Sequence, residues 1–129
     1  MPKLTAIQLT QIAENLVSIA RMLGDYIIRH QLSVKGRLGK LHAAILEEAS
    51  KLYQLSALEV GKEVQLSVET LDELTNELQE TFQDLNDLKL MINLATSVLS
   101  ISTAMAGGDL KGFVQAVKDL RLSLYPEDE

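Results

Sequence analysis

The sequence predicts an all-α fold, an up-down helical bundle of four helices, three long and one short, in a single domain over residues 1–129. First, aliphatic residues recur every three or four positions along most of the chain, which is the period of an amphipathic helix. Second, 7 Gly and 2 Pro in 129 residues are too few for a β-rich or disordered chain. Third, aromatic residues make up only 4% and Trp and Cys are absent, so aliphatic side chains must fill the core without disulfide bonds.

The first helix is expected over residues 4–31, and Thr5 is a suitable N-cap for it. One face carries an apolar stripe of Ile12, Leu16, Ile19, Leu23 and Ile27. Four neighbouring positions broaden this stripe: Leu9, Val17, Ala20 and Ile28. Gly36 and Gly39 then mark a turn.

A second helix is expected over residues 40–64, because two neighbouring apolar stripes continue through that range. Gly61 weakens its last turn. Residues 65–69 form the next turn, since Thr70 and Glu73 fit a capping box for the helix that follows.

The third helix is expected to run from residue 70 to residue 106 without a break, about 55 Å at 1.5 Å per residue. No Gly or Pro interrupts it, and a heptad seam runs along it that includes Leu71, Leu74, Leu78, Leu85 and Leu88. Its first two-thirds match the second helix in length, so the two are expected to form an antiparallel hairpin. From residue 90 to residue 106 there is no charge, and a second stripe appears beside the seam: Met91, Leu94, Val98, Ile101 and Met105. A narrow polar line remains at Asn93, Thr96, Ser100 and Thr103, and this part of the long helix is expected at the centre of the bundle.

That second stripe needs a cover, which the last helix is expected to provide. Gly107 and Gly108 end the long helix, and Asp109 is the N-cap of a short helix over residues 110–124. Its apolar face carries Phe113, Val117 and Leu120. Residues 127–129 form an acidic tail.

Composition and motifs argue against several function classes. The net charge of −6 disfavours general binding of nucleic acid, which needs a basic surface. The two histidines lack the helical spacing of a metal site, and there is no Gly-x-Ser-x-Gly elbow and no phosphate-binding loop. The sequence therefore predicts no enzyme, no cofactor and no metal. The first ten residues lack the pattern of a signal peptide, so a cytoplasmic location is expected.

Two groups of residues are candidate interaction surfaces. The first, which we call the basic turn, is Arg29, Lys35, Arg37 and Lys40, whereas no Lys or Arg lies between Lys62 and Lys89. A basic turn at one end and an acidic face that starts at the other suit binding to an oppositely charged partner. The second group is the heptad seam, whose leucines suit a coiled-coil contact with a second copy of the chain.

The leading hypothesis is therefore a non-enzymatic helical protein–protein interaction module whose partner is another protein, with a homodimer as one form. The alternative is a membrane-docking or membrane-inserting protein that uses the hydrophobic hairpin 90–124. Residues 90–106 approach the length of a membrane span, but six of them are Asn, Ser or Thr. We rank this alternative second, because a buried helix of a soluble protein explains the segment more simply.

Overall fold

A computed structural model describes residues 3–126, and within them the chain forms five α-helices and one pair of very short strands. The all-α class is confirmed, but the predicted count of four helices is wrong. The elements are β1 (Lys3–Leu4), α1 (Ala6–Arg29), α2 (Arg37–Leu52), β2 (Leu58–Glu59), α3 (Lys62–Asp84), α4 (Leu88–Ala106) and α5 (Leu110–Leu124). The acidic tail predicted at 127–129 lies outside the described residues.

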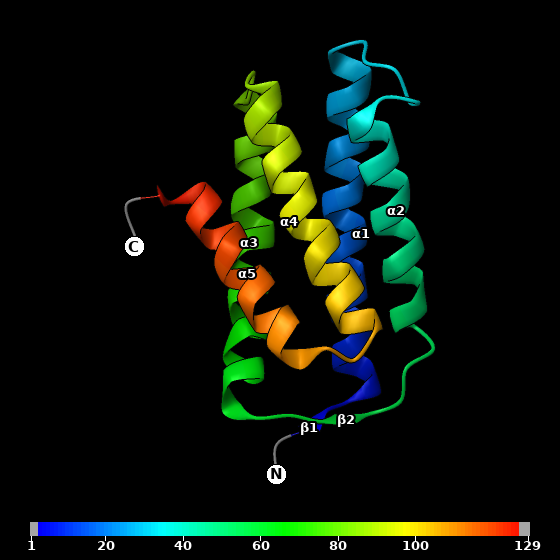
Figure 1. Cartoon of the computed structure of the whole chain (residues 1–129), viewed down its shortest axis with the longest axis vertical. Helices are drawn as coiled ribbons and strands as arrows, with labels where there is room; N and C mark the ends of the chain where they lie inside the picture. Colours follow the sequence, from blue (N-terminus) through cyan, green and yellow to red (C-terminus); the bar gives the residue numbers. More distant parts are fainter. Residues whose placement is uncertain (1–2, 127–129) are drawn as a thin grey trace.

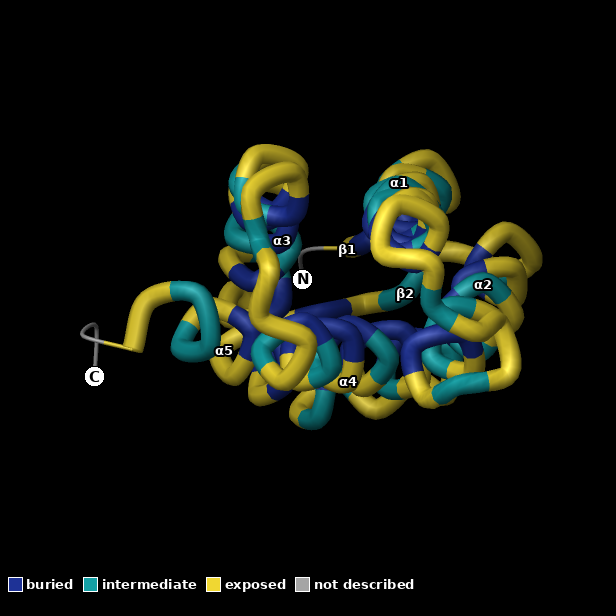
Figure 2. Tube along the Cα trace, turned by 90° about the horizontal axis from the view of Figure 1, so that it is seen from above, coloured by how far each residue is buried: buried dark blue, intermediate teal, exposed yellow. Residues whose placement is uncertain are grey.

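The helices form two layers. Successive helices run in alternating directions along the long axis (Figure 1). Seen along that axis, α1 and α3 form one layer, and α2, α4 and α5 form the other (Figure 2). The largest contacts are between α4 and α5, α1 and α2, and α2 and α4. One continuous aliphatic core lies between the layers, and Leu16, Leu71 and Val98 are among its fully buried members.

The first helix closely follows the prediction, and both of its ends are fixed locally. Thr5 and Gln8 form a reciprocal capping box at its start. At its end Gln31 adopts a left-handed φ of 54°. The Gln31 and Leu32 N–H groups then donate to the carbonyls of Ile28 and Ile27, which is a Schellman motif.

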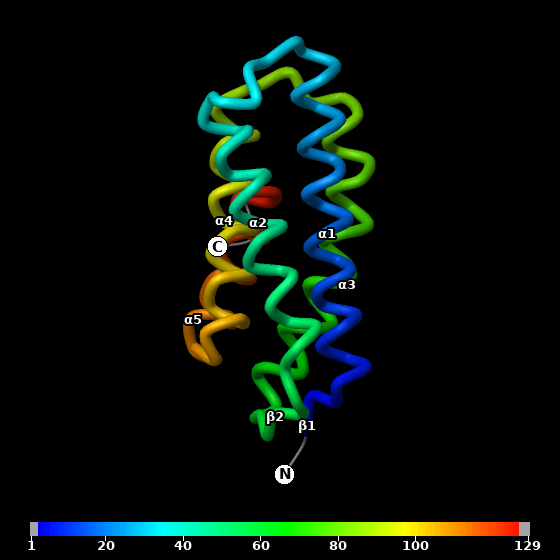
Figure 3. Tube along the Cα trace, turned by 90° about the vertical axis from the view of Figure 1, so that its right-hand side faces the viewer, coloured from blue at the N-terminus to red at the C-terminus, as the bar shows by residue number. Residues whose placement is uncertain are grey.

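The predicted long helix over residues 70–106 is in fact two helices, α3 and α4. The chain turns sharply at residues 85–87, so the two helices lie antiparallel rather than in one rod (Figure 3). Leu85 is extended with a ψ of 127°, and Asp87 caps α4 by accepting the Leu90 N–H at 3.2 Å. The heptad pattern continues across the break, but its leucines are buried only in α3. In α4 the second stripe is buried instead, and the heptad members Leu88, Ile92 and Leu99 are exposed or half-buried. Apolar periodicity does not show whether the backbone is continuous.

The second helix also differs from the prediction, because it ends at Leu52 and not near residue 64. Residues 53–61 instead cross from one layer to the other, and Leu58–Glu59 pairs antiparallel with Lys3–Leu4 on the way. Gly61 does not weaken the end of a helix; it is the N-cap of α3, which already includes the predicted turn at residues 65–69. As a result α2 packs against α1 and α4, and the predicted hairpin of the second and third helices does not form.

The predicted cover over the second stripe is confirmed. Met91, Val98 and Met105 are fully buried, and α5 lies against α4 with Phe113 fully buried. Gly108 has a left-handed φ of 74°, and the N–H groups of Gly108 and Asp109 donate to the Met105 and Ala104 carbonyls. This Schellman motif ends α4, and Asp109 then starts α5 by accepting the Gly112 N–H at 2.9 Å.

Candidate interaction surfaces

The structure brings the four residues of the basic turn to one end of the bundle. They lie at the end of α1, in the loop that follows and in the first turn of α2, and all four are exposed. The turn between α3 and α4 lies at the same end (Figure 3) and carries Asp84 and Asp87. The acidic face of α3 therefore starts at the far end, as expected, but it runs the full length of the bundle and reaches the basic turn.

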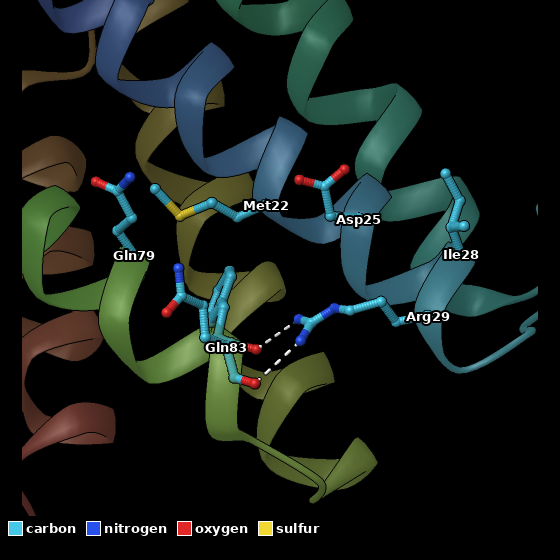
Figure 4. Close-up of a pocket in the computed structure, with 7 residues that line it drawn as sticks. Met22, Asp25, Ile28, Arg29, Gln79 and Gln83 are labelled. Atoms are coloured by element: carbon cyan, nitrogen blue, oxygen red, sulfur yellow. Dashed lines mark hydrogen bonds between the residues drawn. The ribbon is translucent and has the colours of Figure 1, made fainter.

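Arg29 differs from the other three cations because the fold already uses it. Its guanidinium donates to the carbonyls of Phe82 at 2.8 Å and Gln83 at 3.0 Å (Figure 4). Both carbonyls belong to the last turn of α3, where backbone acceptors have no partner within the helix. Arg29 thus caps α3 from the neighbouring helix, and its charge opposes the negative end of the helix dipole.

Lys35, Arg37 and Lys40 surround a helix start that has no side-chain cap. Gly36 is the N-cap of α2 and no side chain accepts a hydrogen bond there. No hydrogen bond or ion pair of these three side chains occurs within residues 3–126. The positive end of the α2 dipole therefore adds to three cations of the same sign, which makes the electrostatic potential around the start of α2 positive.

Two large aliphatic side chains lie exposed beside the basic turn. Ile28 is 76% exposed and Val34 is 75% exposed. The sequence pattern placed Ile28 on the apolar stripe of the first helix. This prediction was wrong, because Ile27 is the last buried residue of the stripe and Ile28 faces solvent. No pattern pointed to Val34, because a single aliphatic residue in a polar loop carries no periodic signal. The basic turn thus combines cations with apolar surface.

The heptad seam divides into a buried part and an exposed part. Leu71, Leu74 and Leu78 are at most 3% exposed and pack in the core of their own chain. Leu85 is half-buried in the turn, and Leu88 is 44% exposed at the start of α4. A contact between two copies along the whole seam would require the core to open, so Leu88 is the member that a partner reaches without any rearrangement.

The outer side of α4 is a surface without charge. We call it the neutral face and define it as Ile92, Asn93, Thr96, Leu99, Ser100 and Thr103, of which the two aliphatic residues are half-buried and the four polar residues are exposed. The sequence showed this polar line and placed α4 at the centre of the bundle. The structure instead places α4 in the middle of the three-helix layer, where one side stays open to solvent (Figure 2).

A groove of about 400 Å³ lies between the ends of α1 and α3 (Figure 4). Met22 and Gln79 point toward each other across it, and the side chain of Ile28 points away. Arg29 also lines the groove, but its guanidinium is held by the two α3 carbonyls. Asp25 contributes a carboxylate to the lining. The groove thus offers apolar and amide surface for a side chain rather than a pair of titratable groups.

The remaining titratable groups form no metal cluster within the described part of the chain. His42 is half-buried, and its Nε2 would lie 3.3 Å from a Cβ added at Gly24.

Tyr26 is buried beside His30, and the centroids of the two rings are 4.1 Å apart. Burial raises the pKa of the Tyr26 phenol above 10.0, and the charge of Asp87 adds to this effect, whereas Arg29 lowers the pKa.

Comparison of the chain with protein-family models, with curated proteins and with solved structures finds no match.

Proposed function

We propose that this chain is a non-enzymatic helical protein–protein interaction module, and that its basic turn binds an acidic segment of another protein. The observation that carries the proposal is the combination of Lys35, Arg37 and Lys40, without side-chain partners in residues 3–126, with the exposed Ile28 and Val34. A partner helix or strand with carboxylates and aliphatic residues complements both parts of this surface. The carboxylates provide attraction and orientation, and burial of the two aliphatic side chains adds affinity that salt does not screen.

The test uses a fluorescent acidic peptide in which leucines alternate with pairs of glutamates, and it measures binding by anisotropy at several salt concentrations. The double substitution Lys35→Glu/Lys40→Glu should weaken binding roughly tenfold or more at low salt. The matched control Lys62→Glu/Lys118→Glu changes the net charge equally at exposed positions away from the basic turn and should have little effect. If the peptide fails to bind at low salt, or if both double variants lose the same affinity, the proposal is wrong.

Membrane docking is the second candidate, and one observation favours it. Helix α4 has 19 residues and is long and apolar enough to cross a membrane by length and composition, although the core helix of a soluble protein passes the same test. Here the hairpin of α4 and α5 would detach from the other helices and insert. Flotation with vesicles of phosphatidylglycerol separates the two candidates. Membrane docking requires the chain to float with the vesicles and to keep doing so at high salt.

A further inference from the structure

The groove between α1 and α3 adjoins the surface that binds the partner in the proposed function. Ile28 is exposed beside the basic turn, and it also lines one edge of the groove. Arg29 belongs to the basic turn, lines the groove as well, and reaches across to the last turn of α3 (Figure 4). The groove and the basic turn are therefore neighbouring parts of one surface around the end of α1.

The two parts of this surface differ in charge. Lys35, Arg37 and Lys40 carry three positive charges and have no side-chain partner in residues 3–126. Two charged side chains line the groove, Asp25 and Arg29, and their charges have opposite signs. A segment that covers both parts is therefore best matched when its carboxylates lie over the three cations and an uncharged side chain lies over the groove.

The inside of the groove suits an apolar side chain. Met22 is half-buried and faces Gln79 across the groove, and the buried Phe82 lines it as well (Figure 4). A methionine side chain is flexible and polarizable, so it adapts its shape to a group that packs against it. The volume of about 400 Å³ accommodates one large aliphatic side chain. Such a side chain loses its contact with water against Met22, which makes it an anchor.

We propose that this groove takes an aliphatic anchor residue from the acidic segment that the basic turn binds. The inference rests on the proposed function and specifies the partner further. Met22 lies six residues before Ile28, about 9 Å along α1, which about three residues of extended chain can span. The anchor is therefore about three residues away from the residue that covers Ile28, and the carboxylates lie on the other side of that residue.

Two fluorescent peptides test this arrangement. Both contain a block of glutamates followed by a leucine, and they differ only at the third residue after that leucine. This residue is a second leucine in the anchored peptide and a serine in the control peptide. The anchored peptide should bind roughly tenfold more tightly, because one more leucine is buried. The ratio of the two affinities should persist at high salt, because salt does not screen apolar burial.

A substitution within the groove tests where the second leucine binds. Gln79→Glu places a carboxylate opposite Met22 and should remove most of the difference between the two peptides. Its repulsion of the glutamate block acts on both peptides alike, so the difference isolates the anchor. Gln11→Glu is the matched control, because it makes the same change at an exposed position near the other end of α1, and it should preserve the difference. If the two peptides bind the unmodified chain equally, the anchor is wrong and the proposed function stands; if neither binds, both are wrong.

Methyl-labelled methionine provides a readout within the groove itself. Met22 is half-buried there, whereas Met91 and Met105 are fully buried in the core. The nuclear magnetic resonance signal of the Met22 methyl group should shift more with the anchored peptide than with the control peptide, and the other two signals should not move. A Met22 signal that stays unchanged while the anchored peptide binds overturns the proposal. A shift that appears on raising the protein concentration without any peptide places a second copy of the chain in the groove, which also overturns it.

Discussion

Replacing Arg29 with alanine removes a side chain that caps the end of α3. Two hydrogen bonds are lost, to the carbonyls of Phe82 and Gln83, and both carbonyls lose a partner from within the chain. A hydrogen bond from a charged donor contributes about 1.5–3 kcal/mol when it is buried. Because Arg29 is an exposed residue, water replaces much of this energy and screens the charge, so we expect a loss of about 1–2 kcal/mol for the pair of bonds.

Urea unfolding followed by circular dichroism measures this loss, and the same signal on heating gives the midpoint temperature. For a chain of this size the midpoint should fall by about 4–8 °C. Arg29→Lys keeps the charge near the helix end but cannot donate to both carbonyls in a fork, so its loss should be intermediate. Arg21→Ala is the matched control, because Arg21 lies two turns earlier on the same side of α1 and is exposed.

Hydrogen exchange locates the effect within the chain. In Arg29→Ala the amides in the last turn of α3 should exchange faster than in the unmodified protein, while those of α5 should keep their relative protection. If Arg29→Ala and Arg21→Ala reduce the free energy of unfolding equally, the two carbonyl contacts contribute nothing measurable and the reasoning fails.

Three further outcomes follow from backbone geometry and burial. Gln31→Gly should raise the free energy of unfolding by about 1 kcal/mol, because Gln31 has a left-handed φ of 54° that glycine adopts without strain; an unchanged or lower midpoint in urea would contradict this. Gly39→Ala should lower it by about 3 kcal/mol, because a Cβ there would lie 2.0 Å from the Val34 carbonyl oxygen. Gly61→Ala is its control, since a Cβ there meets nothing within 4 Å, and equal losses in the two variants would count against the steric argument. Burial raises the pKa of Tyr26 above 10.0 in the folded chain, so its stabilising effect is complete below the pKa of the unfolded chain and is lost as pH rises toward the folded pKa. Unfolding in urea between about pH 9 and about pH 11 should therefore show a decline that is smaller in Tyr26→Phe, and parallel curves would refute this assignment.

The candidate surfaces were predictable to different degrees. The basic turn could be found from sequence, because its four residues are close together in the chain and loops lie on the surface. The capping role of Arg29 could not, because its acceptors are backbone carbonyls more than fifty positions away. The polar line on α4 was visible as a pattern, but its exposure depends on α2 and α5 packing on either side of α4.

The sequence by itself determined the elements whose signals are local. The helix over residues 110–124 has the bounds that were predicted, because Asp109 caps its start and Gly107 and Gly108 end the helix before it. The first helix likewise follows from Thr5 and its apolar stripe. These signals act through backbone groups within a few residues of one another, so the surrounding chain does not alter them.

The tertiary structure alone decided the break at residues 85–87, the short second helix and the pairing of Lys3–Leu4 with Leu58–Glu59. A continuous helix over 70–106 satisfies the same apolar pattern, but it would carry α4 beyond the other helices and leave Met91 and Val98 uncovered. Folding back buries both residues between the layers. The physical reason is that the hydrophobic free energy depends on the total area that the whole chain buries, which a periodic pattern within one segment does not specify.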